Sequence, residues 1–488
     1  MTSTLKHKAV SASIWSAIDI FSRQGLQFGI TMILARLLTP TDYGTVALLS
    51  IFIGVAGVFI SSGFSQALIQ RQKITDTDLS SVFYFNIVTA LLFSVLLCAA
   101  APWIALFYNI PILTPLTRLM ALNLFIGAFG AIQTTLLNKS LDFRKQCVIT
   151  IASVVVSGII AVILAWKSYG VWSLAVSSLA SIFVSTLLLW LLNPWRPTLV
   201  FSLASIRSLF KFGGFLLISG LLDTLYTRLN TLVIGKFYSP RDLGFYSRAD
   251  GTQQLPANLL TGIISRVAFP IFSAAQQDKN HLRAGLRKAI ALVMMINIPV
   301  MLGMFVTSRL LIQVLFGNQW LPSVPYLQIL CLGGILWPLH VLNLNTLLAQ
   351  GHSKLFFRLE VIKKIIGVAI LGTACFFGIT AIAWSIVATS LISFAINAHY
   401  SGRFLNYGIM KQGLDLVPYT LAGLGMALFV WGIGFFTINS PLFLLLAQVL
   451  TGMMIYAFIC GVFRLPAFTE AIQLLGPRLA AKIPFKIG

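Results

Sequence analysis

Charged side chains in the middle of apolar segments are the residues of this chain most able to do chemistry. Arg23, Asp223, Arg228 and Arg266 each lie well inside a long hydrophobic stretch. Counted from the nearest basic flank, Arg23 is roughly 22 Å along a helix and Arg228 roughly 25 Å, at a rise of about 1.5 Å per residue. A charge at that depth costs about 2.5–3.5 kcal/mol, so it normally faces water or an opposite charge. These residues are therefore candidates for contact with a charged substrate.

The charges fall on polar faces of two expected helices. Asp19, Arg23 and Gln27 are spaced i, i+4 and i+8, so they share one helix face. Farther along, Asp223 and Asn230 share another face, from which Arg228 is rotated. We interpret both faces as lining a common water-filled cavity. The alternative is a local Asp19–Arg23 pair that only stabilises packing within one helix.

The composition places these helices in a membrane. The chain is 58% hydrophobic and only 9% charged, which a soluble protein of 488 residues could not keep away from water. Apolar segments of roughly 20 residues or more recur along its whole length. The predicted fold class is an all-α polytopic membrane protein with about 14 transmembrane helices. The predicted spans are 11–38, 44–69, 80–107, 112–138, 146–166, 171–193, 207–236, 244–274, 287–316, 324–349, 360–378, 380–400, 416–437 and 441–463. Because the first span carries Asp19 and Arg23, it does not resemble a cleavable signal peptide.

The net charge of +22 follows this topology. With both termini on the cytoplasmic side, most of the 34 Lys and Arg residues fall on predicted cytoplasmic segments, Lys363 and Lys364 among them. The basic excess therefore indicates a multi-pass membrane topology and contact with anionic lipid headgroups. Nucleic acid is not an expected partner.

A short motif occurs twice, 200 positions apart. Thr39-Pro40-x-Asp42-x-Gly44 returns as Ser239-Pro240-x-Asp242-x-Gly244. In each copy the hydroxyl residue fits an N-cap, the proline fits the first helical position, and the aspartate completes a capping-box-like pair. Both copies therefore mark tight turns between spans, with helix capping as their expected role.

Two weaker echoes follow the motif in the same order, which indicates a duplication of six spans. An even number of spans predicts parallel repeats. The expected division is an N-terminal six-helix lobe at 1–200, a C-terminal six-helix lobe at 201–402, and two further helices with a basic cytoplasmic tail at 403–488.

Motifs for catalysis and for cofactors are missing from the sequence. It contains no GxxxxGK[ST], HExxH, CxxC or GxSxG, so we expect no ATPase, no metal site, no cofactor and no catalytic residue. The five cysteines are isolated in apolar spans, and we interpret them as packing residues. His340 and His399 are likewise expected to be packing or interfacial residues. A polytopic glycosyltransferase or polymerase is disfavoured, because the predicted outer loops are short.

The order and spacing of several motifs resemble Wzx-type polysaccharide flippases. This family belongs to the multidrug/oligosaccharidyl-lipid/polysaccharide exporter superfamily, and the resemblance is to its colanic-acid exporter-like branch. The matching motifs are Leu34-Ala35-Arg36-Leu37-Leu38-Thr39-Pro40-x-Asp42-x-Gly44, Ala67-Leu68-Ile69-Gln70-Arg71, Leu141-Asp142-Phe143-Arg144, Gly244-Phe245-Tyr246-Ser247-Arg248-Ala249 and Arg266-Val267-x-Phe269-Pro270.

The resemblance implies transport of an oligosaccharide repeat unit on a polyprenyl diphosphate, by alternating access, from the inner to the outer leaflet. The product would be an exopolysaccharide, O-antigen of lipopolysaccharide, or capsule, made with a polysaccharide polymerase or copolymerase as partner. A diphosphate needs cations in a wet cavity. The substrate-binding candidates are Arg23, Arg228, Arg266, Gln27 and Asn230. The ion-coupling candidates are Asp19, Asp223 and Asp250.

A drug/cation antiporter of the same superfamily is the alternative function. It would require a more acidic cavity, whereas the deep charges of this chain are mostly positive.

Overall fold

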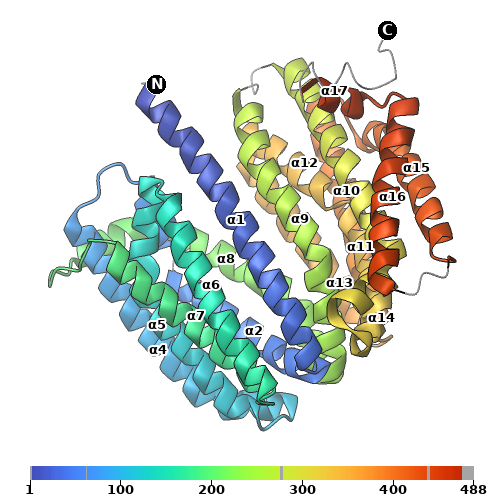
Figure 1. Ribbon diagram of the computed structural model, residues 1–488. Coiled ribbons are helices and arrows are strands. Elements are labelled where there is room, and N and C mark those ends of the chain that lie inside the picture. Colours follow the sequence, from blue (N-terminus) through green and yellow to red (C-terminus); the bar gives the residue numbers. More distant parts are fainter. Residues whose placement is uncertain (1–2, 62, 275–277, 437–439, 475–488) are drawn as a thin grey trace. The chain divides into compact units, whose positions relative to one another are not determined.

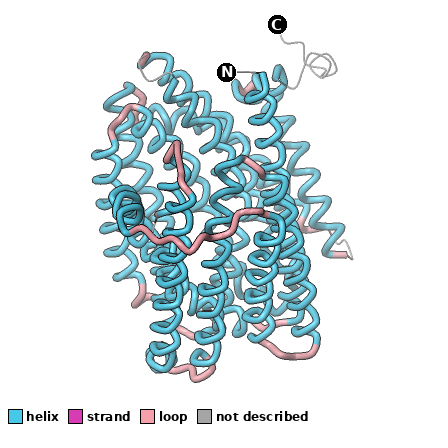
Figure 2. The backbone as a smooth tube through the Cα atoms, turned by 90° about the vertical axis from the view of Figure 1, so that its left-hand side faces the viewer, coloured by secondary structure: helices cyan, strands magenta, loops and turns pink. Residues whose placement is uncertain are grey.

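The computed structural model describes residues 3–61, 63–274, 278–436 and 440–474. Throughout these ranges the chain forms helices joined by turns and loops, with no strand (Figures 1 and 2). The chain divides into two compact units. We call residues Met1–Gly244 the first unit and residues Phe245–Gly488 the second unit.

The first unit holds eight helices and the start of a ninth. They are α1 (Ser3–Leu37), α2 (Pro40–Ser61), α3 (Phe64–Gln70), α4 (Asp76–Tyr108), α5 (Leu113–Ser140), α6 (Phe143–Trp166), α7 (Val171–Leu192), α8 (Leu203–Phe237) and the first turn of α9 (Pro240–Ala274).

The second unit holds the rest of α9 and the helices that follow. They are α10 (Lys279–Phe316), the 3-10 helix η1 (Asn318–Ser323), α11 (Val324–Ile335), α12 (Trp337–Ala349), α13 (Ser353–Ala374), α14 (Ile379–Leu405), α15 (Ile409–Ile433), α16 (Pro441–Val462) and α17 (Pro466–Leu474).

The predicted spans fall on these helices, and the all-α polytopic class is confirmed. Within the described residues, ten helices or helix pairs are long and apolar enough to cross a membrane, and the bent helix α8 makes an eleventh. Helices α1, α9 and α13 are not among them, and each carries five charged residues. These spans are recognised by their length and apolar composition, so a polar helix that crosses the membrane would not be counted. The number of fourteen spans therefore stays a prediction. The polar helices are where function is expected.

Helix α8 packs in the first unit, along α2 and α4. Its contact with α2 uses small residues. A Cβ on Gly54 would lie 3.0 Å from the Thr224 methyl group, and one on Gly220 would lie 3.3 Å from Val58. Small residues let membrane helices approach closely and gain van der Waals contact. The first unit therefore extends past residue 200, the boundary predicted for the first lobe, and that division stays a prediction.

Both copies of the repeated motif cap helices, as predicted. Thr39 donates from its backbone N–H to Asp42 Oδ2 at 2.9 Å, and the Asp42 N–H donates to Thr39 Oγ1 at 3.3 Å. In the second copy the Asp242 N–H donates to Ser239 Oγ at 3.1 Å. The prolines begin α2 and α9 at positions where a missing N–H costs nothing.

The two copies also touch each other through their glycines, which the sequence did not predict. A Cβ on Gly44 would lie 1.7 Å from the carbonyl oxygen of Pro240, and a Cβ on Gly244 would lie 1.9 Å from that of Pro40. The first turns of α2 and α9 thus cross with backbone against backbone. Only glycine permits so short a distance between the two backbones. The motif glycines therefore allow the two helices to cross, while the other motif residues cap the helix ends.

The second unit is built around α10, which packs against α11, α12, α15, α16 and α17. At one end of this bundle an ion pair joins two helices. Arg287 on α10 donates to both oxygens of Asp415 on α15, each at 2.7 Å, and the Tyr407 hydroxyl donates to the same carboxylate at 2.7 Å. Burial and the neighbouring carboxylate raise the pKa of Tyr407, so its phenol keeps the proton that it donates.

Beside this ion pair lies a fully buried amide network. Gln412 on α15 donates to Asn343 Oδ1 on α12 at 2.9 Å and to the Tyr407 carbonyl at 3.0 Å. Ser401 on α14 donates to the same Asn343 oxygen. Three helices are therefore joined by groups that have no access to solvent.

We expect Gly44→Ala to destabilise the protein, because the new methyl group would meet the Pro240 carbonyl. Overpacking of this kind costs about 1–3 kcal/mol. Thermal denaturation of the purified protein in detergent measures the loss. Gly57→Ala on the same helix is the matched control, since a Cβ there meets nothing within 4 Å. Equal melting temperatures for the two variants would contradict the close crossing.

Replacing Gln412 by Ala should also lower the melting temperature, since it removes the two hydrogen bonds between the buried amides of Gln412 and Asn343. A buried group deprived of its hydrogen bond costs about 1–3 kcal/mol. Met410→Ala, at a side chain that is 75% exposed on the same helix, is the control and should change little. A Gln412→Ala variant as stable as wild type would argue against the network.

Candidate functional site

Helix α1 packs along α6 in a constant register. Leu34 clusters with Ala161, and Ile30 contacts Gly158, where a Cβ would lie 2.3 Å from the Ile30 Cδ1 atom. Near the other end of the helix, the Arg144 guanidinium lies 5.7 Å from the centre of the Trp15 ring. The residue numbers of each pair differ by nearly the same amount, so the two helices run parallel along this contact.

Toward its N-terminal half, this face of α1 becomes polar. The Asp19 carboxylate interacts with the Thr150 hydroxyl on α6 and with the Arg23 guanidinium. Its Oδ1 atom is buried and has no hydrogen-bond partner within the described residues. Arg23 and Gln27 are exposed. The structure thus brings Asp19 and Arg23 together, and it also places Asp19 against α6.

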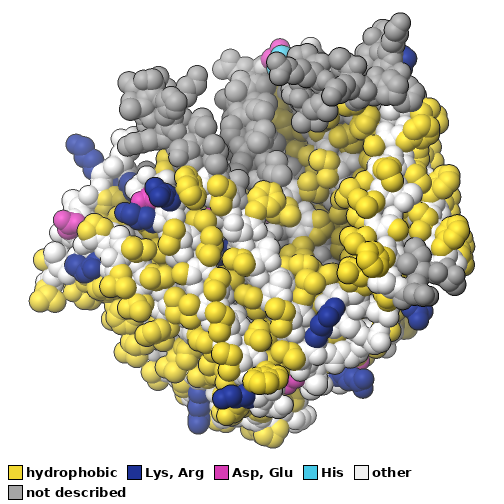
Figure 3. Space-filling view, in the orientation of Figure 1, with side chains coloured by type: hydrophobic (Ala, Val, Ile, Leu, Met, Phe, Trp, Pro, Cys, Tyr) yellow, Lys and Arg dark blue, Asp and Glu magenta, His cyan; other side chains and the backbone are white. Residues whose placement is uncertain are grey.

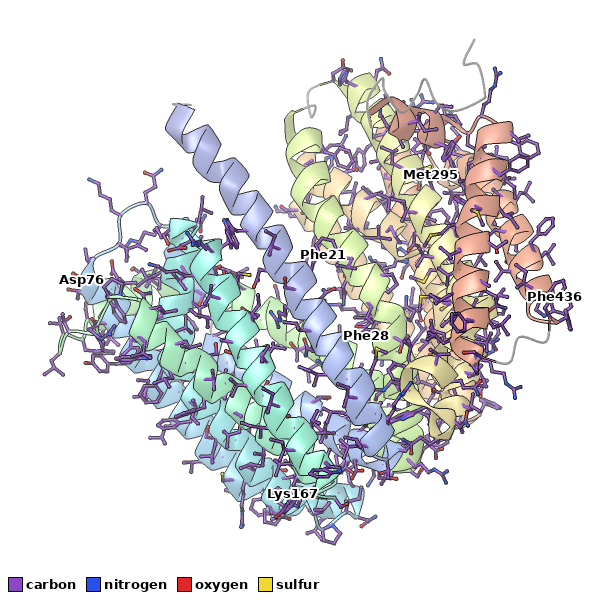
Figure 4. All side chains as sticks on the ribbon, in the orientation of Figure 1. Phe21, Phe28, Asp76, Lys167, Met295 and Phe436 are labelled. Carbon is purple, nitrogen blue, oxygen red and sulfur yellow. The ribbon has the colours of Figure 1, made fainter. Side chains whose placement is uncertain are left out.

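The described part of α1 also exposes apolar side chains. Phe21 and Phe28, both labelled in Figure 4, lie two turns apart on this helix, and Phe21 is 58% exposed. A helix that exposes an aromatic ring at Phe21 and a guanidinium at Arg23 suits a boundary between lipid and a polar passage.

Helix α8 is the second polar helix. Asp223 and Arg228 are exposed and Asn230 is half-buried. Thr227 donates from Oγ1 to the Asp223 carbonyl at 2.9 Å, so its hydroxyl is satisfied within the helix. Because Thr224 lies against Gly54 of α2, the charged residues flank the packed face of α8.

The two polar helices have different neighbours: α1 lies on α6, and α8 lies on α2 and α4. The other two predicted residues lie on α9 in the second unit. Asp250 is half-buried and accepts a 2.8 Å hydrogen bond from Gln254 Nε2. The Arg266 side chain is outside the described residues. A common cavity for all the predicted residues therefore stays a prediction.

Opposite ends of the first unit carry most of its fixed charge. Asp76 and Lys167 mark the two ends in Figure 4. Near Asp76, Arg71 pairs with Asp78 at 3.2 Å, and Lys139 donates to the Leu68 carbonyl at 3.0 Å. Hydrophobic side chains cover most of the visible face of this unit between basic groups at its margins (Figure 3). This banding suits a membrane-embedded bundle.

One polar cluster was not predicted. Lys363 is only 8% exposed and pairs with Glu360. Lys363 was predicted to lie on a cytoplasmic segment, and His340 to be a packing or interfacial residue. Lys363 lies ten residues inside α13, on its buried face, and its position relative to the membrane stays a prediction. Only the packing of α13 against α12 and α14 decided which face of α13 is buried.

Metal and disulfide chemistry find no support in the part of the chain that the structure describes. No group of three His, Cys, Asp or Glu side chains there could hold a metal ion. The five cysteines are free thiols.

Comparisons with known proteins agree on one family. The family model described as "Polysaccharide biosynthesis protein" matches residues 33–325. The chain is 28% identical over 415 residues to the teichuronic acid biosynthesis protein TuaB of Bacillus subtilis (strain 168), covering 84% of this chain and 85% of that protein. It is also 28% identical over 366 residues to the lipopolysaccharide biosynthesis protein WzxC of Escherichia coli (strain K12), covering 74% of each.

A solved structure supports the fold. The lipid II flippase MurJ, in an inward closed conformation, superimposes with a TM-score of 0.76 at 17% sequence identity, over 92% of this chain and 98% of that one. At this identity the likeness concerns the fold alone. It shows that the helical architecture described above is that of a known transporter fold.

Cysteines introduced on the polar faces of α1 and α8 should be accessible to water. In a cysteine-free background, we expect Gln27→Cys and Arg228→Cys to react with a charged, water-soluble methanethiosulfonate reagent, because a thiol must ionise to react. Val95→Cys on α4 is the control: Val95 is 57% exposed but lies on an apolar helix that should face lipid. Labelling measured by mass shift that is equal at all three positions would exclude a polar passage.

Proposed function

Because the chain belongs to the polysaccharide biosynthesis protein family, we propose that it is a flippase that moves a polyprenyl-diphosphate-linked oligosaccharide across a membrane for surface polysaccharide synthesis. TuaB and WzxC are named for teichuronic acid and lipopolysaccharide biosynthesis, and MurJ is named a lipid II flippase. A lipid-linked glycan is the substrate class consistent with all three names.

The observation that carries the proposal is the exposure of Arg23 and Arg228 on two helices of an otherwise apolar bundle. A guanidinium in hydrocarbon is costly, so both exposed side chains are expected to face water or a bound anion. Arginine forms bidentate hydrogen bonds with phosphate oxygens. The diphosphate is therefore the part of the substrate that we assign to these residues.

The remaining parts of the substrate fit other features. Gln27 and Asn230 offer amides that can donate to and accept from sugar hydroxyls. The apolar surface of α1 around Phe21 suits a polyprenyl chain that stays in lipid. In this proposal the glycan and the diphosphate cross along a polar path while the lipid tail remains in the bilayer.

The cellular setting follows from the substrate. The protein is a multi-pass integral membrane protein, and we place it in the plasma (inner) membrane with both termini in the cytoplasm. It would work as a transporter by alternating access, and it would deliver its cargo to a polysaccharide polymerase or copolymerase. Arg266 would add a further cation, and Asp19, Asp223 and Asp250 are the acidic candidates for ion coupling.

A transport assay tests the function directly. Purified protein is reconstituted with an undecaprenyl-diphosphate trisaccharide that carries a nitrobenzoxadiazole (NBD) label on the sugar, and external dithionite reports the leaflet of the label. Wild-type protein should move the labelled probe from the inner leaflet, where it is protected, to the outer leaflet, where dithionite reaches it. Loss of a hydrogen bond to a charged group costs about 1.5–3 kcal/mol, so Arg23→Ala and Arg228→Ala should each slow transport roughly 10- to 100-fold.

Lys167→Ala, at an exposed cation beyond the end of α6, is the control and should transport like wild type. Full activity in both arginine variants would remove the diphosphate assignment. Failure of the wild-type protein to move the probe, together with export of an organic cation such as ethidium, would favour the drug/cation antiporter instead.

A further inference from the structure

The loop between α7 and α8 exposes a run of apolar side chains. Leu199 is 97% exposed, and Val200 and Phe201, which follow it, are also exposed. In Figure 1 this loop is drawn in green at the margin of the first unit. Single exposed apolar residues are ordinary on a protein surface, whereas a contiguous run marks an interaction site.

Hydrogen bonds fix both ends of this run. The Thr198 N–H donates to Ser80 Oγ at 3.0 Å, and the Ser202 N–H donates to Ser81 Oγ at 2.8 Å. Both serines belong to α4 and are fully buried. The three apolar residues between these two hydrogen bonds therefore form a short bulge that is attached to α4 on either side. Their side chains are held outward by this attachment.

The first two turns of α8 continue the same surface. Ile206 and Leu209 are buried in the core of the first unit. Leu203, Arg207 and Phe210 are spaced i, i+4 and i+7, so they share another face of the helix, and all three are exposed. This exposed face places one guanidinium between two apolar side chains, an arrangement typical of a helix in a membrane interface.

This segment of α8 also bends away from the span that follows it. Leu203–Phe210 and Gly213–Phe237 form an angle of 56°. At a rise of about 1.5 Å per residue, Gly213–Phe237 alone is about 37 Å long, which exceeds the bilayer core of about 30 Å. The first two turns of α8 are therefore not needed to cross the membrane. Their inclination suits a segment that lies along the membrane surface.

The neighbours of the loop indicate what covers it. The loop joins two helices, α7 and α8, that are apolar enough to span a membrane, so it lies at a membrane boundary. Exposed apolar side chains continue onto both helices, with Leu191 near the end of α7 and Phe215 on α8. The exposed run is thus continuous with the surface that lipid covers, and a membrane lipid is the occupant that this continuity favours.

The charge of the segment favours an anionic lipid. Arg196 and Arg207 are both exposed, and neither forms an ion pair with an acidic side chain among the described residues. Arg196 donates to the carbonyls of Asn193 and Trp190, so its hydrogen-bonding capacity is largely used within the loop. Arg207 is the cation available to a phosphate headgroup, which guanidinium groups bind well.

We propose that residues 198–210 form a membrane anchor that binds an anionic phospholipid in the headgroup layer. Leu199, Phe201 and Leu203 enter the boundary of the acyl chains, and the Arg207 guanidinium donates to the lipid phosphate. The bound lipid holds the start of α8, the helix that carries Arg228. This anchor goes beyond the proposed transport function, since it concerns the surrounding bilayer and not the transported substrate.

The depth of the loop tests the anchor. Leu199→Cys is made in a cysteine-free background, labelled with NBD and reconstituted in vesicles of phosphatidylcholine and phosphatidylglycerol. The label should be quenched by a doxyl group on the lipid acyl chains and protected from aqueous iodide. Lys73→Cys is the matched control. It lies in the loop before α4, at the same end of the first unit, and it should be quenched by iodide.

Two results of this measurement would contradict the anchor. Iodide quenching at both positions would show that the apolar run faces water. Protection of the Leu199→Cys label from both quenchers would show that a protein, either a second copy of this chain or another partner, covers the run in place of lipid.

The preference for anionic lipid is measured with the same label. Spin-labelled phosphatidylglycerol and spin-labelled phosphatidylcholine are compared as quenchers at equal mole fraction. One cation near an anionic lipid surface strengthens binding about fivefold, so phosphatidylglycerol should have a relative binding constant about fivefold higher. Arg207→Gln should remove this preference, because Gln keeps a polar side chain at an exposed position but carries no charge.

Lys167→Gln, at an exposed cation beyond the other end of the first unit, is the control and should keep the preference. Equal binding of the two lipids by the protein with Arg207 intact, or an unchanged preference in Arg207→Gln, would overturn the headgroup assignment. Neither measurement requires transport, so a failure of the anchor and a failure of the flippase proposal are distinguishable.

Discussion

The absence of water in a bilayer core is the constraint on which this structure depends. A polar group without a partner costs several kcal/mol there, so each helix end and each charged side chain must be satisfied by the protein or by an aqueous path. The helix termini show the first solution. Thr75 and Asp78 form a reciprocal capping box at the start of α4, and Arg196 donates to the carbonyls of Trp190 and Asn193 after α7.

The same constraint separates the roles within the duplicated motif. Its hydroxyl and acidic residues satisfy backbone groups of one turn each, and its glycines bring the two turns into contact. A crossing of this kind has no side chains to interlock and depends on backbone shape alone. Small residues therefore matter here for the distance that they allow, and not for any chemistry of their own.

The two units place their charges differently. In the first unit, Arg23 and Arg228 stay exposed on helices that otherwise fit lipid, as expected of groups that meet a substrate. In the second unit, Lys363 is buried and paired, and the nearby network of Asn343 and Gln412 has no access to solvent. An exposed cation can bind and release an anion, whereas a buried and paired one is held within its own unit.

The sequence by itself determined the all-helical membrane class, the capping roles of Thr39 and Asp42, and the presence of deep charges on α1 and α8. These follow from composition, from residue spacing and from the cost of charge in hydrocarbon, which are local properties. Only the tertiary structure decided that Gly44 meets Pro240, that Asp19 faces Thr150 of α6, and that Lys363 is buried beside Glu360. Such contacts depend on how distant helices pack, and helical periodicity shows which face a residue occupies but not which helix that face meets.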